Sequence, residues 1–203
     1  MNEFTDDLQV AERQREAIAE ACYELASAEG FAAVTLEDVA VRSGLPLETV
    51  LTHFDDPDEL IEYVIVGDIG QVMAETTVLF SGGTSAPDVV VEVFAYVYRR
   101  LCDTLTFKEL LEPGRTRLMD HLRGNRPENL ILSIDFVAEE LRTLGVRTGT
   151  PVDDPDGGAE FFIRLLLSLI VSPQLGPDLS EDGVVEAVAR RWLLPGLFSG
   201  QAR

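Results

Sequence analysis

Residues 35–54 read TLEDVAVRSGLPLETVLTHF, a stretch that predicts two short helices joined by a glycine turn. Thr35 is suited to cap the first helix, because its side-chain oxygen can accept from a free backbone N–H of the first turn. Gly44 suits the turn, and Pro46 suits the first position of the next helix. A longer helix is expected over residues 12–29, so the three have the lengths and spacing of a helix-turn-helix.

Helical patterns continue along the rest of the chain, and the sequence predicts an all-α protein of about nine helices. The β-branched runs at 88–98 and 161–171 fit buried helices in length and context. Gly145 is expected to end one helix, and Asp156 is expected near the start of the next. The expected helices cover residues 12–29, 36–43, 46–54, 57–80, 88–107, 115–123, 127–144, 159–172 and 180–194.

The sequence predicts one small and one larger domain. Residues 1–56 are expected to form the helix-turn-helix domain, and residues 57–203 are expected to form the larger domain. The helix over 57–80 connects the two. The clearest linker, and a further candidate boundary, is SGGTSAP at 81–87, because glycine, serine and proline favour irregular structure.

Composition limits the possible functions. The 203 residues carry a formal net charge of −20 and are 46% hydrophobic, which is ample for a buried core. So negative a chain has little non-specific attraction for nucleic acid or for an anionic membrane. The first ten residues, MNEFTDDLQV, lack the basic start and apolar run of an export signal. The protein is therefore expected in the cytoplasm.

The apolar segments support the same location. The most apolar stretch, FFIRLLLSLIVSPQL, contains Arg164 and is too short to span a bilayer, so no membrane partner is expected. Cys22 and Cys102 both fall in apolar helical patterns and are expected to be small core residues in a reducing compartment.

An ordered pattern extends beyond the helix-turn-helix spacing. It comprises Ala21, Leu25, Gly30, Thr35, Val39, Ala40, Ser43, Gly44, Leu45, Thr49, Val50, His53, Phe54 and Leu60. With this pattern, the stretch from Ala17 to Leu60 resembles the N-terminal domain of the TetR family of bacterial transcriptional regulators. The stretches AEFFIRLLLSLIVSP and AVARRWLLPGLF resemble the C-terminal helices with which members of this family dimerise. The resemblance implies a homodimer with two DNA-reading heads and a ligand pocket in each larger domain.

Three positions depart from the family pattern, and each departure removes a contact to a DNA phosphate. Pro46 stands where the family usually has serine or threonine, Leu51 where tyrosine is common, and Pro57 where lysine is frequent. Charge adds to this effect, because residues 1–60 contain three basic and fifteen acidic residues, a net charge of −12. Phosphate neutralisation supplies most non-specific DNA affinity, so this head is expected to have little.

Several residues of the head nevertheless suit DNA contact. Hydroxyl, imidazole and guanidinium groups can bind phosphates or base edges, and a glutamate can accept from cytosine N4. The start of the helix after Thr35 also offers free backbone N–H groups to an anion. The candidate DNA-binding residues are Thr35, Arg42, Leu47, Glu48, Thr49, Thr52 and His53. Structural packing is the alternative role for Thr49 and His53.

The first helix carries a stripe of like charge. Glu12, Glu16, Glu20 and Glu24 are spaced four apart and therefore lie along one side of it. One interpretation is a solvated face, and the other is an acidic surface that binds a basic protein partner.

The larger domain is expected to bind a small hydrophobic ligand. Aromatic and aliphatic residues on its helices can line a pocket, although the same spacing also fits plain core. The candidate ligand-binding residues are Phe94, Tyr98, Leu101, Phe107, Met119, His121 and Phe136. The sequence has no phosphate loop, no metal-ligand spacing and no nucleophile motif, so no catalytic residue, metal or cofactor is expected and the chain is interpreted as a non-enzyme.

The C-terminal helices are expected to pair across a homodimer. Residues 161–171 are apolar nearly all round, which is typical of a helix buried in its own domain or paired with a second copy. The candidate dimer-interface residues are Phe162, Leu165, Leu166, Leu169, Val184, Val188 and Trp192.

Two functional hypotheses follow. The first is a ligand-responsive regulator, a repressor that binds operator DNA as a homodimer. The alternative is a protein of the same fold whose acidic head no longer binds DNA, and which binds a small molecule or a basic protein partner.

Overall fold

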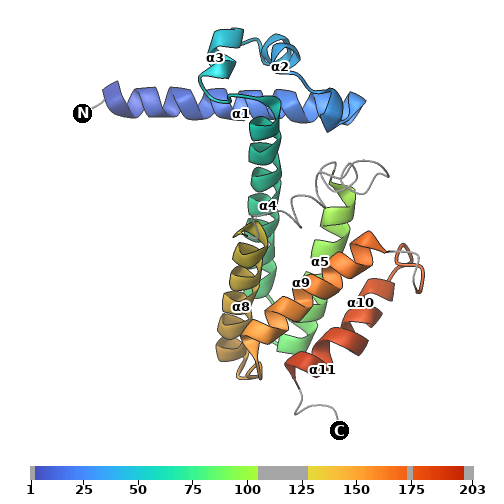
Figure 1. Cartoon of the computed structure of the whole chain (residues 1–203). Coiled ribbons are helices and arrows are strands. Elements are labelled where there is room, and N and C mark those ends of the chain that lie inside the picture. Colours follow the sequence, from blue (N-terminus) through green and yellow to red (C-terminus); the bar gives the residue numbers. More distant parts are fainter. Residues whose placement is uncertain (1–2, 105–127, 173–175, 199–203) are drawn as a thin grey trace. The chain divides into compact units, whose positions relative to one another are not determined.

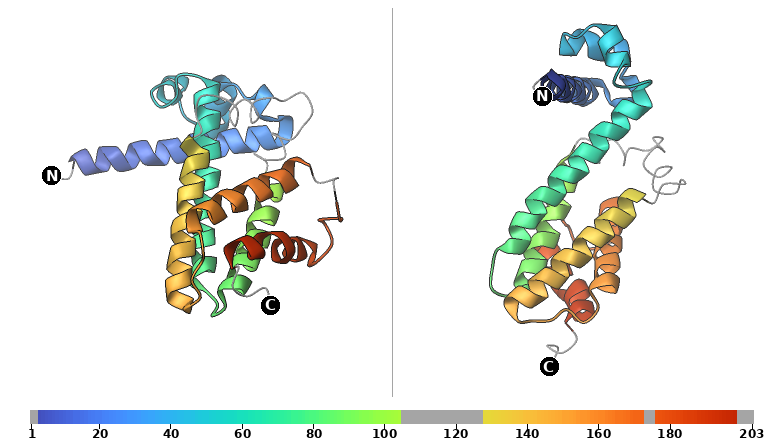
Figure 2. Two further views of the ribbon diagram at one scale, coloured as in Figure 1. Left: turned by 60° about the horizontal axis from the view of Figure 1, so that its bottom comes forward. Right: turned by 90° about the vertical axis from the view of Figure 1, so that its left-hand side faces the viewer.

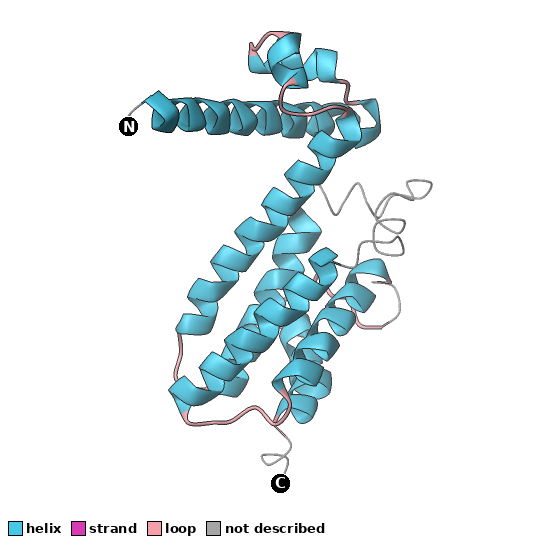
Figure 3. Cartoon of the chain, turned by 60° about the vertical axis from the view of Figure 1, so that its left-hand side comes forward, coloured by secondary structure: helices cyan, strands magenta, loops and turns pink. Residues whose placement is uncertain are grey.

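The computed structural model describes residues 3–104, 128–172 and 176–198, and each regular element in these ranges is helical (Figure 3). The all-α prediction is confirmed. The helix expected at 115–123 lies outside the described residues. The elements are α1 (Glu3–Glu29), η1 (Phe31–Ala33), α2 (Leu36–Ser43), α3 (Leu47–Leu51), α4 (Pro57–Ser81), α5 (Ala86–Asp103), α8 (Glu128–Thr148), α9 (Pro155–Val171), α10 (Val184–Val188), η2 (Ala189–Leu193) and α11 (Leu194–Leu197) (Figure 1).

The chain forms two compact units, Met1–Ile69 and Gly70–Arg203. We call them the head unit and the body unit. Helix α4 contributes its first half to the head unit and its second half to the body unit. The division of the chain into functional domains at residue 57 stays a prediction.

In the head unit, α2 packs on α1 and α3 packs on α2, and the first turns of α1 extend past both (Figure 1). Ile18 of α1, Val39 of α2 and Val50 of α3 are fully buried. Phe54 packs edge-on against Tyr63 of α4, with ring centroids 5.4 Å apart. Burial of each such side chain stabilises the fold by roughly 1.5–3 kcal/mol, so the apolar pattern of the sequence holds the three helices together.

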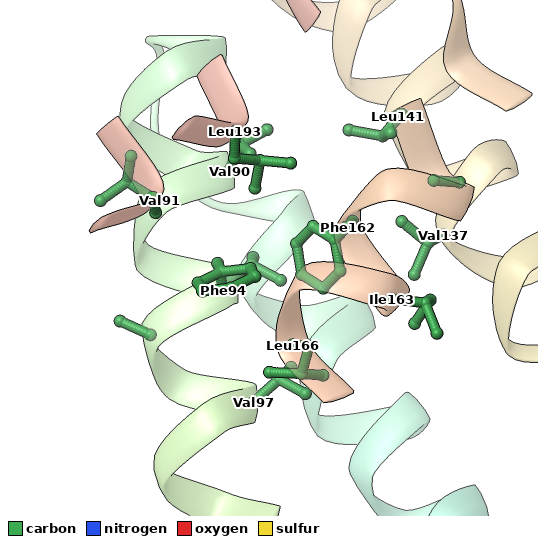
Figure 4. Packing of buried hydrophobic residues seen from close by; sticks show 14 of the residues in the cluster. Val90, Val91, Phe94, Val97, Val137, Leu141, Phe162, Ile163, Leu166 and Leu193 are labelled. Carbon is green, nitrogen blue, oxygen red and sulfur yellow. The ribbon is translucent and has the colours of Figure 1, made fainter. Parts of the chain in front are cut away.

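The body unit is built around α5, which packs against α9 and α10 (Figure 2). Its β-branched run is helical and buried, as the sequence predicts. Phe94 of α5 meets Phe162 of α9 edge-to-face, with ring centroids 5.0 Å apart (Figure 4). Val137 and Leu141 of α8 pack on the other side of α9 (Figure 4). A helix apolar nearly all round fits this position between two neighbours.

Several helix boundaries differ from the sequence-based ones. Helix α1 begins at Glu3, nine residues before the predicted start at residue 12. Helix α8 continues through Gly145 to Thr148, and the left-handed φ of +69° at Gly149 follows it. Gly145 instead allows the next loop to pass close by, because a Cβ there would lie 3.3 Å from the carbonyl oxygen of Thr150.

Helix α9 begins at Pro155, four residues earlier than predicted. Asp154 caps it, since its Oδ1 accepts from the N–H of Gly157 at 3.1 Å. The capping residue is therefore Asp154, and Asp156 lies in the first turn.

The last helical run contains a π turn, η2, just before Pro195. The N–H of Leu194 donates to the carbonyl of Ala189, five residues back. Pro195 has no N–H to give to the carbonyl of Arg191, and its ring crowds that carbonyl. The wider turn accommodates the proline without ending the helix.

Helix α4 is, among the described residues, the one helix long and apolar enough to cross a membrane by length and composition alone. Leu60 and Val64 of its first half are buried in the head unit, and Val72 and Phe80 of its second half are buried in the body unit. Burial in two cores accounts for part of this apolar composition without a bilayer.

Candidate nucleic-acid interface

The start of α2 is where the sequence predicts a phosphate contact, and Thr35 is already engaged there. Its Oγ1 accepts from the N–H of Asp38 at 3.2 Å and donates to Asp38 Oδ2 at 2.6 Å. The carboxylate of Asp38 interacts favourably with the helix dipole that would otherwise attract an anion. Glu29 and Asp38 both line a small pocket beside the start of α2. The start of α2 therefore carries negative charge of its own.

Arg42, at the C-terminal end of α2, is paired within the head unit. Its Nη1 lies 3.5 Å from Glu24 Oε2 of α1, and about half of each side chain is exposed. Exposed ion pairs of this kind contribute about 0–1 kcal/mol, so a phosphate can compete for the guanidinium. The cation nevertheless begins with its charge balanced by a carboxylate.

Helix α3 turns Val50 into the core and leaves other candidate residues at the surface. Glu48 is exposed, and Leu47 and Thr49 are half-buried. Thr52, just past the helix, is exposed and donates its hydroxyl hydrogen to the carbonyl of Thr49 at 2.7 Å. Its oxygen can still accept a hydrogen bond. A hydroxyl and a carboxylate are thus the polar groups that α3 and its end offer to a partner.

His53 is half-buried and joins α3 to α1. Its Nε2 lies 3.0 Å from Gln14 Oε1, a contact between residues 39 apart in the chain. This hydrogen bond fixes the end of α3 on α1, so the structure supports the packing role of His53 that the sequence offered as an alternative.

The acidic stripe of α1 is fully displayed. Glu12, Glu16, Glu20 and Glu24 are all exposed, on the side of α1 opposite the buried Ile18. Exposure fits both the solvated face and the acidic binding surface that the sequence suggests. One of the four carboxylates, that of Glu24, is the ion-pair partner of Arg42.

The predicted ligand-binding residues fall into two groups. Phe94, Tyr98 and Leu101 of α5 are buried in the body-unit core, and Phe136 of α8 is half-buried against it. Burial raises the pKa of the Tyr98 hydroxyl to about 12, so this group is a neutral hydrogen-bonding group at physiological pH. The remaining candidates, Phe107, Met119 and His121, lie outside the described residues.

The predicted dimer face needs correction at two positions. Phe162 and Leu166 are buried in the core of the body unit, so neither side chain reaches a surface that a second copy could cover. Leu165, Leu169, Val184 and Val188 are half-buried. Trp192 is 56% exposed, and the guanidinium of Arg191 lies 4.9 Å from its ring centroid.

Sequence reasoning missed three residues that the structure brings forward. Gln14 and Glu24 of α1 hold two of the predicted DNA-binding side chains, and Phe161 of α9 is 42% exposed. A helix that is apolar nearly all round gives no signal of which residues face outward, so Phe161 could not be separated from Phe162. The stripe that contains Glu24 was visible, but its pairing with α2 was not.

Sequence comparison finds no matching family model and no matching curated protein. Comparison with solved structures defines the class of fold, because the chain has the fold of TetR-family transcriptional regulators. The sequence resemblance to this family is thus confirmed at the level of the fold.

Three of these structures illustrate the similarity. A TetR-family transcriptional regulator from Pectobacterium atrosepticum has a TM-score of 0.72 at 16% identity, covering 94% of this chain and 96% of that one. The TetR-family repressor AlkX from Dietzia sp. strain DQ12-45-1b has a TM-score of 0.64 at 17% identity, covering 87% and 94%. FadR from Bacillus subtilis, solved in complex with stearoyl-CoA, has a TM-score of 0.60 at 14% identity, covering 90% and 98%.

Proposed function

We propose that the chain is a member of the TetR family and acts as a ligand-responsive transcriptional repressor that binds operator DNA as a homodimer. The observation that carries this proposal is an intact helix-turn-helix on a fold shared with transcriptional regulators. Thr35 caps α2, Gly44 adopts the left-handed φ of +72° that the turn needs, and Val50 anchors α3. The helix cap, the glycine turn and the buried side chain that position α3 are thus all present.

The proposed DNA contacts come from α3 and the end of α2. Glu48 and Thr52 are exposed and suit base edges, with Leu47 and Thr49 beside them. Arg42 releases Glu24 and binds a DNA phosphate in its place. Few phosphates are neutralised in this way, so we expect a shallow salt dependence and specificity that rests on base contacts.

The body unit supplies dimerisation and ligand response in this proposal. A second copy packs on apolar side chains that α9 and η2 leave at the surface, namely the exposed Phe161 and Trp192 and the half-buried Leu165. A small hydrophobic ligand binds beside α5, and its binding changes the separation of the two heads. FadR, a protein of this fold, was solved in complex with stearoyl-CoA, a molecule that includes a long apolar chain, and this supports the proposed ligand class.

Fluorescence anisotropy with DNA flanking the coding region, measured across a salt series, tests the proposal. Sequence-selective binding is expected, and Arg42→Ala should weaken it. Glu24→Gln should strengthen it, because the guanidinium of Arg42 is then free for a phosphate. Glu12→Gln is the matched control, since it removes one charge of the same stripe without touching Arg42. A folded dimer that fails to bind any flanking DNA at low salt contradicts the repressor function.

A second candidate function rests on the pairing of Arg42 with Glu24 and on the exposed acidic stripe. In this alternative, the head unit has lost DNA binding and its acidic surface binds a basic protein. Absence of DNA binding together with salt-sensitive binding of a basic partner, weakened by neutralising Glu16 and Glu20, would favour it.

A further inference from the structure

Helix α4 is tied to α5 in the body unit by a cluster of polar side chains that the functional site does not use. Glu75 is the one charged residue of α4 after Asp68. Its Oε2 accepts from the hydroxyl of Tyr96 at 2.7 Å and from Nε of Arg100 at 3.1 Å. Its Oε1 accepts from Gln71 of its own helix at 3.0 Å.

The two donors of α5 are arranged as a carboxylate receptor. Tyr96 and Arg100 are one helical turn apart and therefore project from the same side of α5. A phenol and a guanidinium converge on a single oxygen atom, and such charge-assisted hydrogen bonds are among the stronger ones in proteins. The hydrogen bonds hold the pKa of Glu75 below its usual range, with the bond from Tyr96 as the main cause.

The receptor is only partly used by Glu75. Among the described residues, Arg100 donates through Nε alone, although a guanidinium has five N–H donors and can grip both oxygens of a carboxylate. The side chains of Arg100 and Glu75 keep 26% and 31% of their surface exposed, so a solute can reach the pair. A free carboxylate can thus make a contact with Arg100 that Glu75 does not make.

Helix α4 is bound to the body unit in a way that permits exchange. Its backbone makes few close approaches to the described helices of the body unit, whereas α8 and α9 pack closely. Long side chains therefore bridge α4 and α5. Along the two helices, the cluster is flanked by Val72, Val93 and Val97, which belong to the apolar core.

We propose that Tyr96 and Arg100 form a carboxylate-binding site, which Glu75 fills in this structure and which the carboxylate of an apolar effector takes over. The exchange releases Glu75 of α4 from Tyr96 and Arg100 of α5, and the apolar side chains of α4 stay in the body-unit core. This inference rests on the proposed function for the existence of an effector, and it names the chemical class of that effector.

Isothermal titration of the full chain with sodium octanoate, and with 1-octanol as the uncharged match, tests the site. Removing the internal competitor in Glu75→Ala should tighten octanoate binding roughly tenfold or more, because a hydrogen-bonded carboxylate no longer has to be displaced. Glu75→Gln should tighten it to a smaller extent while preserving the shape of the side chain. Adding Arg100→Met to Glu75→Ala should abolish the gain.

Glu140→Ala is the matched control, because Glu140 of α8 also binds α4, through Thr77 Oγ1 at 2.9 Å, but lies outside the cluster. It should leave octanoate affinity unchanged. Equal octanoate affinity in the wild type and in both Glu75 variants would overturn the inference, as would equal affinity for 1-octanol. Octanoate binding of the expected pattern by a chain that binds no DNA would keep the carboxylate site and overturn the proposed function.

Discussion

Gly158 lies in α9 at a point where any side chain would overlap the core. A Cβ built on it would collide with Cδ2 of Leu197, which is fully buried. We expect Gly158→Ala to lower the free energy of unfolding by about 1–3 kcal/mol, because overpacking outweighs the better helix propensity of alanine. Urea unfolding measures the change, with Gly196→Ala in α11 as a control whose Cβ meets open space. Equal stability of the two variants would show that the core yields at Leu197.

Cys22 is buried on α1, and burial raises the pKa of its thiol from 9.0 to about 12. The folded head unit keeps the thiol neutral, while the unfolded chain ionises it above its ordinary pKa. Its contribution to stability is therefore fully present below about pH 9 and is lost as the pH rises towards 12. Between pH 8 and about pH 10.5, the free energy of unfolding should decrease by less in Cys22→Ala than in the wild type. Cys102→Ala is the control at a half-buried position, and in this variant the decrease should be closer to that of the wild type.

Single residues were predictable where their signal is local. Thr35 and Gly44 were recognised because a cap and a left-handed turn depend on a few neighbouring residues. The partners of Arg42 and His53 were not, because Glu24 and Gln14 belong to another helix and meet them only in the folded head. Chemical type in the sequence thus identified candidate groups, and the fold determined how they are occupied.

At the scale of the element, Arg147 of α8 closes the C-terminal end of α4. Its guanidinium donates to the carbonyl oxygens of Phe80, Gly82 and Gly83 at 2.8, 2.7 and 2.7 Å. Carbonyl groups at the C-terminal end of a helix have no N–H partner within the helix. A cation near them also interacts favourably with the helix dipole. One side chain from a distant helix thus satisfies the end of α4 and the loop after it.

We expect Arg147→Met to lower the free energy of unfolding by about 2–3 kcal/mol, since hydrogen bonds from a charged donor are lost while the aliphatic volume is kept. Arg164→Met is the matched control, because Arg164 makes an exposed pair with Glu160 on its own helix and should contribute below about 1 kcal/mol. Hydrogen exchange should also speed up at the end of α4 in the first variant alone. Unchanged exchange there would contradict the clamp.

Elements were predicted well in kind and less well in extent and orientation. The periodic segments became helices, but Gly145 did not stop α8, because a close-packed loop rather than a turn requires the glycine. The apolar pattern of α9 predicted a helix without predicting its phase. Phe161 and Phe162 differ by one position, yet one is exposed and the other is in the core. Only the neighbours α5 and α8 decide between them.

At the scale of the whole molecule, charge is divided unequally between the two units. Residues 1–69 contain three basic and seventeen acidic residues, whereas residues 70–203 contain thirteen and nineteen. Net charge is therefore −14 in the head unit and −6 in the body unit. Repulsion between two such heads is long-ranged at low salt, which favours the less charged body unit as the part that holds two copies together in the proposed dimer.

The proposed dimer makes a prediction at this scale. Phe161 and Trp192 are exposed on α9 and η2, which pack against each other, and large aromatic side chains commonly dominate protein interfaces. We expect Phe161→Glu or Trp192→Glu to weaken dimerisation by roughly 30-fold or more, as for an interface residue that contributes about 2 kcal/mol. Light scattering after gel filtration at several concentrations measures the shift towards monomer.

Val146→Glu on α8 is the control, because Val146 is also apolar and is 86% exposed but lies on another helix. A wild-type monomer would contradict the proposed dimer, and the same shift in all three variants would place the interface elsewhere. Operator affinity should fall together with dimerisation, because a single head contacts one half-site only.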